Sequence, residues 1–168
     1  MKKFFVGATL ALLGLPLHSI LPADPRIDVS RVIDKTEAAT ILGEAVKDST
    51  PRNGDGADGY YSKCNYYSVN RGKSLVIRLH VPSADAIGPQ KELQLLAATD
   101  SGMQSVADLG DAAKMTISGG DTGFASRILM LYVAKGNAFV TIGLGGFADD
   151  AVALEKAKAV AQKLLVNF

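Results

Sequence analysis

Alternating and helical patterns of apolar residues divide the chain into eight regular elements. Apolar positions recur at helical spacing over 35–46 and again in a last helix that begins at Asp149 or Asp150. Pro89 suits a first helical turn, so a further helix is expected from there to near Gly102. Five runs rich in strand-forming residues complete the pattern, at 60–67, 74–81, 114–118, 127–134 and 138–144.

The connections between these elements predict the fold class. Turn-forming residues at 70–72 and 135–137 each separate two strands, which are therefore antiparallel. The order α-β-β-α-β-β-β-α predicts an α+β fold, with helices packed against an antiparallel sheet of about five strands. The strand at 127–134 is apolar on both faces and is expected at the centre, whereas 48–59 is rich in turn residues and is expected to be a surface loop.

The first predicted hairpin contains the only cysteine of the chain, Cys64. With the turn centred on 71–72, paired residue numbers sum to 143 and Cys64 faces Leu79. Period-two alternation then separates Cys64 from His80 across the sheet. His80 is the only histidine outside the first residues of the chain, so we expect a buried inert thiol and no Cys–His pair.

The first 23 residues are typical of a secretory signal peptide. Lys2 and Lys3 precede an uncharged apolar run at 4–15, and Ala23 offers a small residue at the cleavage point. We expect residues 24–168 to form one domain, periplasmic or secreted, with no membrane anchor in the mature chain. Removal of the leader lowers the basic count from 18 to 16 against 17 acidic residues, so binding to nucleic acid is not expected.

Three short segments carry a resemblance to known proteins. They are ILGEAV at 41–46, KCNYY at 63–67 and ADLGDAA at 107–113. Together they resemble a group of small exported bacterial proteins of unknown function, which includes lipoproteins and sensor domains with folds like the Mog1p/PsbP family. The resemblance implies an antiparallel sheet flanked by helices and no established catalytic residues. This chain lacks an anchoring cysteine and a second cysteine, so no family disulfide can form.

The outward side of the first hairpin is the main candidate for a binding surface. It carries six residues with aromatic, amide or basic side chains: Tyr61, Lys63, Asn65, Tyr67, Arg78 and His80. Tyrosines interleaved with hydrogen-bond donors are typical of surfaces that recognise a polar ligand or a protein partner. An ordinary solvated sheet face, on which tyrosine and lysine pair across strands, is the alternative.

Other motifs give weaker hypotheses. Residues 53–60 resemble one unit of a calcium-binding repeat, which makes Asp55 and Asp58 a weak calcium candidate. The tripeptide at 121–123 matches that of aspartic proteases, and 143–148 matches a dinucleotide-binding loop, but neither has the surrounding elements that such sites need. With a single histidine left, no other metal site and no cofactor are expected.

These observations favour a non-catalytic binding domain of the bacterial envelope, whose ligand is a small molecule or an envelope protein. One alternative is an envelope enzyme that uses carboxylates. Another is a structural or assembly subunit that associates through an exposed sheet edge. Self-association is left open by the sequence.

Overall fold

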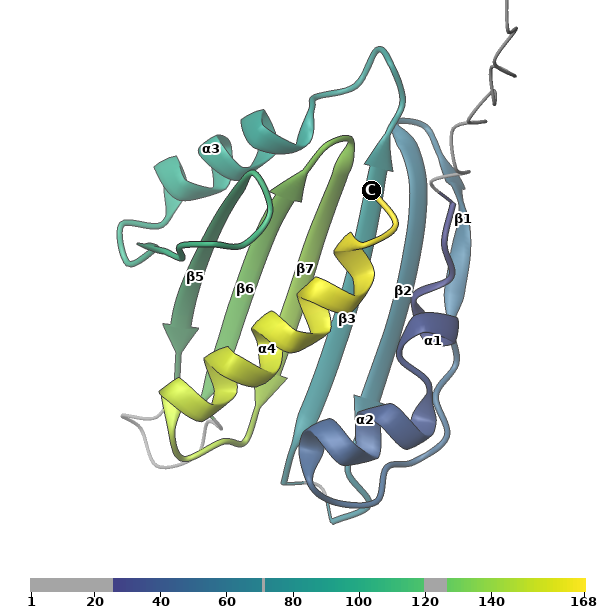
Figure 1. The fold of residues 1–168 in the computed structure, drawn as a ribbon, viewed down its shortest axis with the longest axis vertical. Helices are drawn as coiled ribbons and strands as arrows, with labels where there is room; N and C mark the ends of the chain where they lie inside the picture. Colours follow the sequence, from purple (N-terminus) through teal and green to yellow (C-terminus); the bar gives the residue numbers. More distant parts are fainter. Residues whose placement is uncertain (1–25, 71, 120–126) are drawn as a thin grey trace, which may run out of the picture.

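The fold is a single seven-stranded antiparallel sheet with helices on both faces, as seen in a computed structural model that describes residues 26–70, 72–119 and 127–168 (Figure 1). The strands are β1 (Arg52–Gly56), β2 (Gly59–Tyr67), β3 (Ser74–Pro82), β4 (Gln104–Ser105), β5 (Ala112–Ser118), β6 (Ile128–Lys135) and β7 (Ala138–Gly145). The helices are α1 (Val29–Val32), α2 (Lys35–Leu42), α3 (Pro89–Thr99) and α4 (Asp150–Leu165). The α+β class and the antiparallel sheet are confirmed, whereas the leader at 1–23 and the tripeptide at 121–123 lie outside the described residues.

The two faces of the sheet have different covers. The first, which we call the helix face, carries the main core and is covered by α1, α2 and α4, with α4 crossing the strands obliquely (Figure 1). Of the opposite face, which we call the outer face, the described residues cover one end, where Leu93 of α3 packs on Ala134 and Phe139. Within the described residues, no helix is long and apolar enough to cross a membrane.

The centre of the sheet is β7 and not the strand predicted for that place. The strand order is β1-β2-β3-β7-β6-β5-β4, and all eight residues of β7 are buried. The predicted central strand became β6, on which Met130 and Tyr132 remain partly exposed on the outer face. Both strands are strongly apolar, so composition alone could not order them; the strand order depends on the β3–β7 pairing, which joins residues far apart in the chain.

The prediction of a surface loop at 48–59 is wrong, because part of it forms the edge strand β1. Its sequence, Arg-Asn-Gly-Asp-Gly, contains poor strand formers. The strand nevertheless pairs with β2 from Arg52↔Lys63 to Gly56↔Gly59, since β2 offers it a full ladder of backbone groups. The short strand β4 was also not predicted, so β1 and β4 together raise the sheet from about five strands to seven, and the short helix α1 was not predicted either.

The predicted register of the β2–β3 hairpin is wrong by two residues. Cys64 lies opposite Ile77, so paired numbers sum to 141. The cause is Ser68, whose backbone N–H donates to Lys73 O at 3.0 Å and whose hydroxyl accepts from Lys73 N at 2.9 Å, closing a longer loop. A shift of two residues keeps every side chain on its predicted face. The predicted separation of Cys64 from His80 is therefore confirmed, and Cys64 is fully buried.

The first predicted helix is shorter than its sequence pattern suggested. Asp34 caps α2 by accepting a hydrogen bond from Glu37 N at 2.8 Å, as the sequence indicated. The helix ends at Leu42 because Gly43 adopts a left-handed conformation with φ of 72°. Val46, predicted to be helical, instead forms an isolated β-bridge with Ser68.

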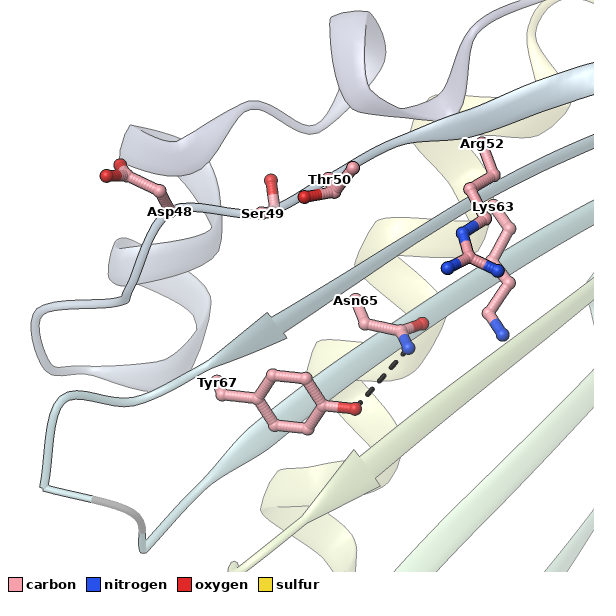
Figure 2. A pocket seen from close by; sticks show the side chains of 7 residues that line it. All are labelled: Asp48, Ser49, Thr50, Arg52, Lys63, Asn65 and Tyr67. Atoms are coloured by element: carbon pink, nitrogen blue, oxygen red, sulfur yellow. Dashed lines mark hydrogen bonds between the residues drawn. The ribbon is translucent and has the colours of Figure 1, made fainter.

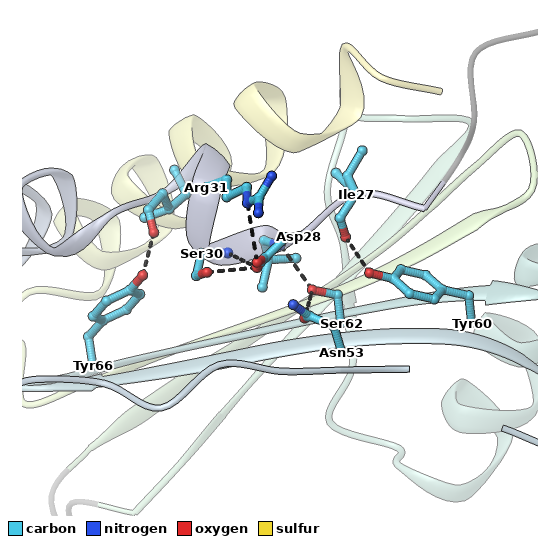
Figure 3. A network of polar contacts seen from close by, with 10 residues as sticks. Ile27, Asp28, Ser30, Arg31, Asn53, Tyr60, Ser62 and Tyr66 are labelled. Atoms are coloured by element: carbon cyan, nitrogen blue, oxygen red, sulfur yellow. Dashed lines mark hydrogen bonds and ion pairs between the residues drawn. The ribbon is translucent and has the colours of Figure 1, made fainter. Parts of the chain in front are cut away.

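The inward residues of β2 fasten the segment before α2 to the sheet (Figure 3). The Tyr60 hydroxyl donates to Ile27 O at 3.1 Å, and the Tyr66 hydroxyl donates to Ile33 O. Between them, Ser62 Oγ accepts from the Val29 backbone N–H at 2.9 Å. Half of the tyrosine-rich strand therefore serves the fold, because these hydroxyls satisfy backbone groups that would otherwise be buried without partners.

Candidate functional site

The outer face brings together the six residues proposed from the sequence. The pairs Tyr61↔His80 and Lys63↔Arg78 lie directly opposite each other on β2 and β3, and Asn65 and Tyr67 continue along β2. Helix α3 reaches only the end of this face near His80. The outer face of β1, β2 and β3 thus has two parts. One part is open and carries Lys63, Asn65, Tyr67 and Arg78, and the other is the end of the strands at Tyr61 and His80, beside α3.

Three cationic side chains cross the open part in one row, which we call the basic row: Arg52, Lys63 and Arg78. Arg52 is the direct partner of Lys63, and Lys63 is the direct partner of Arg78. Both arginines are exposed, and the lysine is half-buried. Like charges directly opposite each other on a sheet destabilise it. Within the described residues, none of the three side chains forms a hydrogen bond or an ion pair.

A cavity of about 340 Å³ adjoins the basic row (Figure 2). It is lined by Asp48, Ser49, Thr50, Arg52, Lys63, Asn65 and Tyr67. The Asn65 amide donates weakly to the Tyr67 hydroxyl at 3.4 Å, and its oxygen is buried without a donor among the described residues. The Tyr67 ring is half exposed. Hydroxyls, an amide and two cations thus surround the cavity, beside one aromatic ring.

The single carboxylate of this cavity has its own partner. Lys35 Nζ lies 2.6 Å from Asp48 Oδ1, and this contact lowers the pKa of the Asp48 carboxyl below its usual value. Lys35 belongs to α2, which covers the helix face. Asp48 therefore makes no ion pair with the basic row, and no carboxylate of the described residues pairs with the positive charge of the row.

At its other end, the outer face is closed by a compact polar cluster around His80. The His80 ring stacks on Tyr61 with centroids 4.3 Å apart and planes within 1°. Nδ1 of His80 lies 3.2 Å from Glu92 Oε2 on α3, while the Tyr61 hydroxyl donates to Asp58 Oδ2 at 2.7 Å. These contacts join the turn before β2, both strands and α3 beside a second cavity of about 410 Å³, which Ile87 and Leu95 also line.

Asp58, one carboxylate of this cluster, is stabilised in its ionised form. The hydrogen bond from Tyr61 lowers the pKa of Asp58, which keeps that carboxyl ionised at neutral pH. A carboxylate enzyme needs one acid whose pKa is raised by its surroundings. Asp58 does not have that property, and within the described residues no three His, Cys, Asp or Glu side chains gather as a metal site would require.

Alkaline solution should unfold the protein through the tyrosines whose pKa is raised in the folded state. Burial raises the pKa of Tyr61 to about 12, assisted by the bond to Asp58, and burial also raises the pKa of Tyr60, Tyr66 and Tyr132. Unfolded tyrosine ionises near pH ~10. The folded state therefore holds protons that the unfolded state releases, so this stability is complete below pH ~10 and falls as the pH approaches about 12.

The measurement is the ultraviolet absorbance of tyrosinate, followed together with circular dichroism during an alkaline titration. We expect most of the absorbance change to coincide with loss of the folded spectrum. Ionisation of most tyrosines near pH ~10 with an intact folded spectrum would contradict the burial of their hydroxyls.

The remaining sequence candidates do not come together as sites. Asp55 of β1 lies opposite Tyr60, on the helix face, and contacts Arg26 at 3.6 Å, whereas Asp58 binds the hydroxyl of Tyr61 on the outer face. The two calcium candidates therefore have separate partners. Gly143 and Gly145 of the dinucleotide-like motif lie inside β7 and pair with β3 and β6, so they form no phosphate-binding loop.

Arg52 is the residue of the basic row that the sequence analysis missed. It was assigned to the loop 48–59 and so had no predicted face. The dipeptide Asp58-Gly59, which is common in tight hairpin turns, could have revealed the β1–β2 hairpin. Counting back across a turn centred on these two residues places Arg52 opposite Asn65, two positions from its actual partner Lys63 and therefore on the same face of the sheet.

Comparison with known proteins does not assign the chain to a family. No protein-family model matches the chain, and a search of curated proteins finds no relative. The resemblance to small exported bacterial proteins stays a prediction, so the functional proposal depends on the site alone.

Proposed function

We propose that this protein is a non-catalytic binding domain of the bacterial envelope and that its ligand binds the open part of the outer face. The observation that carries the proposal is the basic row, Arg52, Lys63 and Arg78, on the outer face of β1, β2 and β3, where no described helix lies over these side chains. Cations placed directly opposite each other weaken a sheet. A row without acidic partners therefore contributes to binding and not to folding.

The surroundings of the row support binding over catalysis. A small-molecule site combines a concave surface with a few polar groups that converge on it, as Asn65 and Tyr67 do here. Covalent catalysis needs a nucleophile with a base in reach. Cys64 is buried on the helix face, across the sheet from His80, so these two side chains cannot cooperate.

The location in the envelope depends on the predicted leader. When the full chain is expressed in a bacterium, we expect the periplasmic or culture fraction to contain a protein that begins near Asp24. Mass spectrometry of the intact protein measures this directly. An uncleaved chain confined to the cytoplasm would contradict the proposed location.

Binding at the open face is tested by mapping amide chemical shifts in NMR spectra. The probes are oligogalacturonate, muropeptides from peptidoglycan, neutral dextran oligomers and calcium chloride. We expect at least one probe to shift amides of β2 and β3 around Lys63 and Arg78, with the change lost in Tyr67→Ala and Arg78→Ala. Val152→Ala, an exposed position on α4, is the matched control. If no probe shifts these strands, or both variants behave as wild type, the proposed function is wrong.

A further inference from the structure

We infer that the ligand of the open face is an acidic glycan, a chain of sugars that carry carboxylates, bound across the strands along the basic row. This inference rests on the proposed function and specifies its ligand. It is carried by three properties of the described residues: the charge of the row, its spacing, and the polar groups beside it.

The positive charge of the row favours an anionic ligand. Arg52, Lys63 and Arg78 have no acidic partner among the described residues, and Asp48 in the adjoining cavity is held by Lys35. Arginine donates two parallel hydrogen bonds to a carboxylate, which gives the two outer positions of the row a preference for that group. Binding of an anion would also relieve the repulsion between the three neighbouring cations.

The spacing of the row favours a ligand whose anionic groups repeat at a regular interval. Neighbouring strands lie ~4.8 Å apart, so the backbone positions from which the three cationic side chains of β1, β2 and β3 extend are separated by about that interval. One sugar ring spans a similar length, so a polymer with one carboxylate on each ring presents charges at a matching repeat. The glycan would then lie across β1, β2 and β3, at right angles to the direction of the strands. Contact with all three cations would require a chain of at least three acidic sugars.

The polar groups beside the row favour a ligand that carries hydroxyl groups. Ser49, Thr50 and the Tyr67 hydroxyl line the cavity together with Asn65, whose oxygen is buried without a donor. A buried acceptor that lacks a donor costs free energy, and a sugar hydroxyl can supply the missing donor. The exposed ring of Tyr67 offers an apolar surface on which the C–H face of a sugar can lie.

The same features disfavour nucleic acid and anionic membranes. Domains that bind nucleic acid usually have a pI above ~9, whereas the sequence pI is about 7.8 and removal of the leader lowers the basic count further. Single strands are held by several stacked aromatic rings, but among the described residues Tyr67 alone supplies a ring to this cavity. Membrane surfaces are held by clusters of four or more basic residues or by inserted apolar side chains, and the described residues that line the cavity include neither.

The test is isothermal titration of the mature protein with oligogalacturonate and with the same oligomer after reduction of its carboxyl groups. We expect binding of the acidic oligomer, with an affinity that falls as salt rises, and at least tenfold weaker binding of the reduced oligomer. Equal binding of both oligomers at the open face would overturn the acidic-glycan inference and leave the proposed function intact. Tighter binding of single-stranded DNA or of anionic lipid vesicles would also overturn it.

Substitutions locate the binding energy on the row. We expect Lys63→Gln and Arg78→Gln each to weaken oligogalacturonate by about 10- to 100-fold, the range for loss of a charge-assisted hydrogen bond. Lys158→Gln, which removes a cation of α4 on the other side of the molecule, is the control and should bind as wild type. Equal weakening by all three substitutions would show non-specific charge attraction and would overturn the inference.

Discussion

Replacement of Ile142 by alanine lowers the free energy of unfolding by about 2–5 kcal/mol, the range for truncation of a large buried aliphatic side chain. Ile142 lies at the middle of β7, opposite Ile77 on one side and Leu131 on the other, and is fully buried. Helix α4 covers this part of the sheet, so the cavity left by the substitution cannot collapse without moving the helix. Urea denaturation followed by circular dichroism measures the change.

An exposed isoleucine provides the control for this substitution. Ile87 precedes α3 and is 55% exposed, so Ile87→Ala should change the free energy of unfolding by less than ~0.5 kcal/mol. Comparable effects of Ile87→Ala and Ile142→Ala would contradict the central position of β7. A small effect of Ile142→Ala alone would contradict its burial beneath α4.

Replacement of Gly59 by alanine should be comparably damaging for a different reason. Gly59 begins β2 with φ of 146°, a conformation that residues with a side chain rarely adopt. A Cβ there would lie 2.2 Å from the Val81 carbonyl oxygen, which belongs to the backbone of β3 and cannot turn away. Backbone strain of this kind costs about 1–3 kcal/mol, and the steric overlap adds to it, so we expect a loss of about 3 kcal/mol or more.

Gly54 is the matched control for Gly59. It lies in the same hairpin, on β1, and a Cβ added to it meets no atom within 4 Å. Gly54→Ala should therefore leave the free energy of unfolding nearly unchanged, as measured by the same urea titration. Equal stability of the two variants would mean that the β1–β2 turn does not require the Gly59 conformation. The result bears on the site as well, since this turn carries Asp58 and places β1 beside β2.

Alternation along β2 and β3 was enough to predict which side chains share a face. The register was wrong by two residues, yet Lys63, Arg78 and His80 still lie on the outer face, because a shift of two preserves alternation. The actual register depends on the hydroxyl of Ser68, which closes the loop by a bond to the backbone of Lys73. Such local side-chain bonds are not visible in a hydrophobic pattern.

Long-range pairing explains what the sequence could not predict. Strand β1 exists because β2 offers it hydrogen-bonding groups, although its own residues favour turns. The division of the outer face by α3 likewise depends on Leu93, which packs on residues about 40 positions later in the chain. Periodicity therefore predicted the residues that β2 and β3 place on the outer face. It could not predict where α3 covers that face, nor that Arg52 adds a third cation to it.

The central claim is that the basic row contributes to binding and opposes stability. Lys63→Glu places an acid between Arg52 and Arg78, so it converts two repulsive pairs into attractive ones across β1, β2 and β3. The decisive measurement is the affinity of this variant for oligogalacturonate, made on protein whose free energy of unfolding has been determined. We predict that binding falls more than tenfold while stability is unchanged or higher by up to ~1 kcal/mol. Unchanged affinity, or a loss of binding accompanied by a loss of stability, would contradict the account.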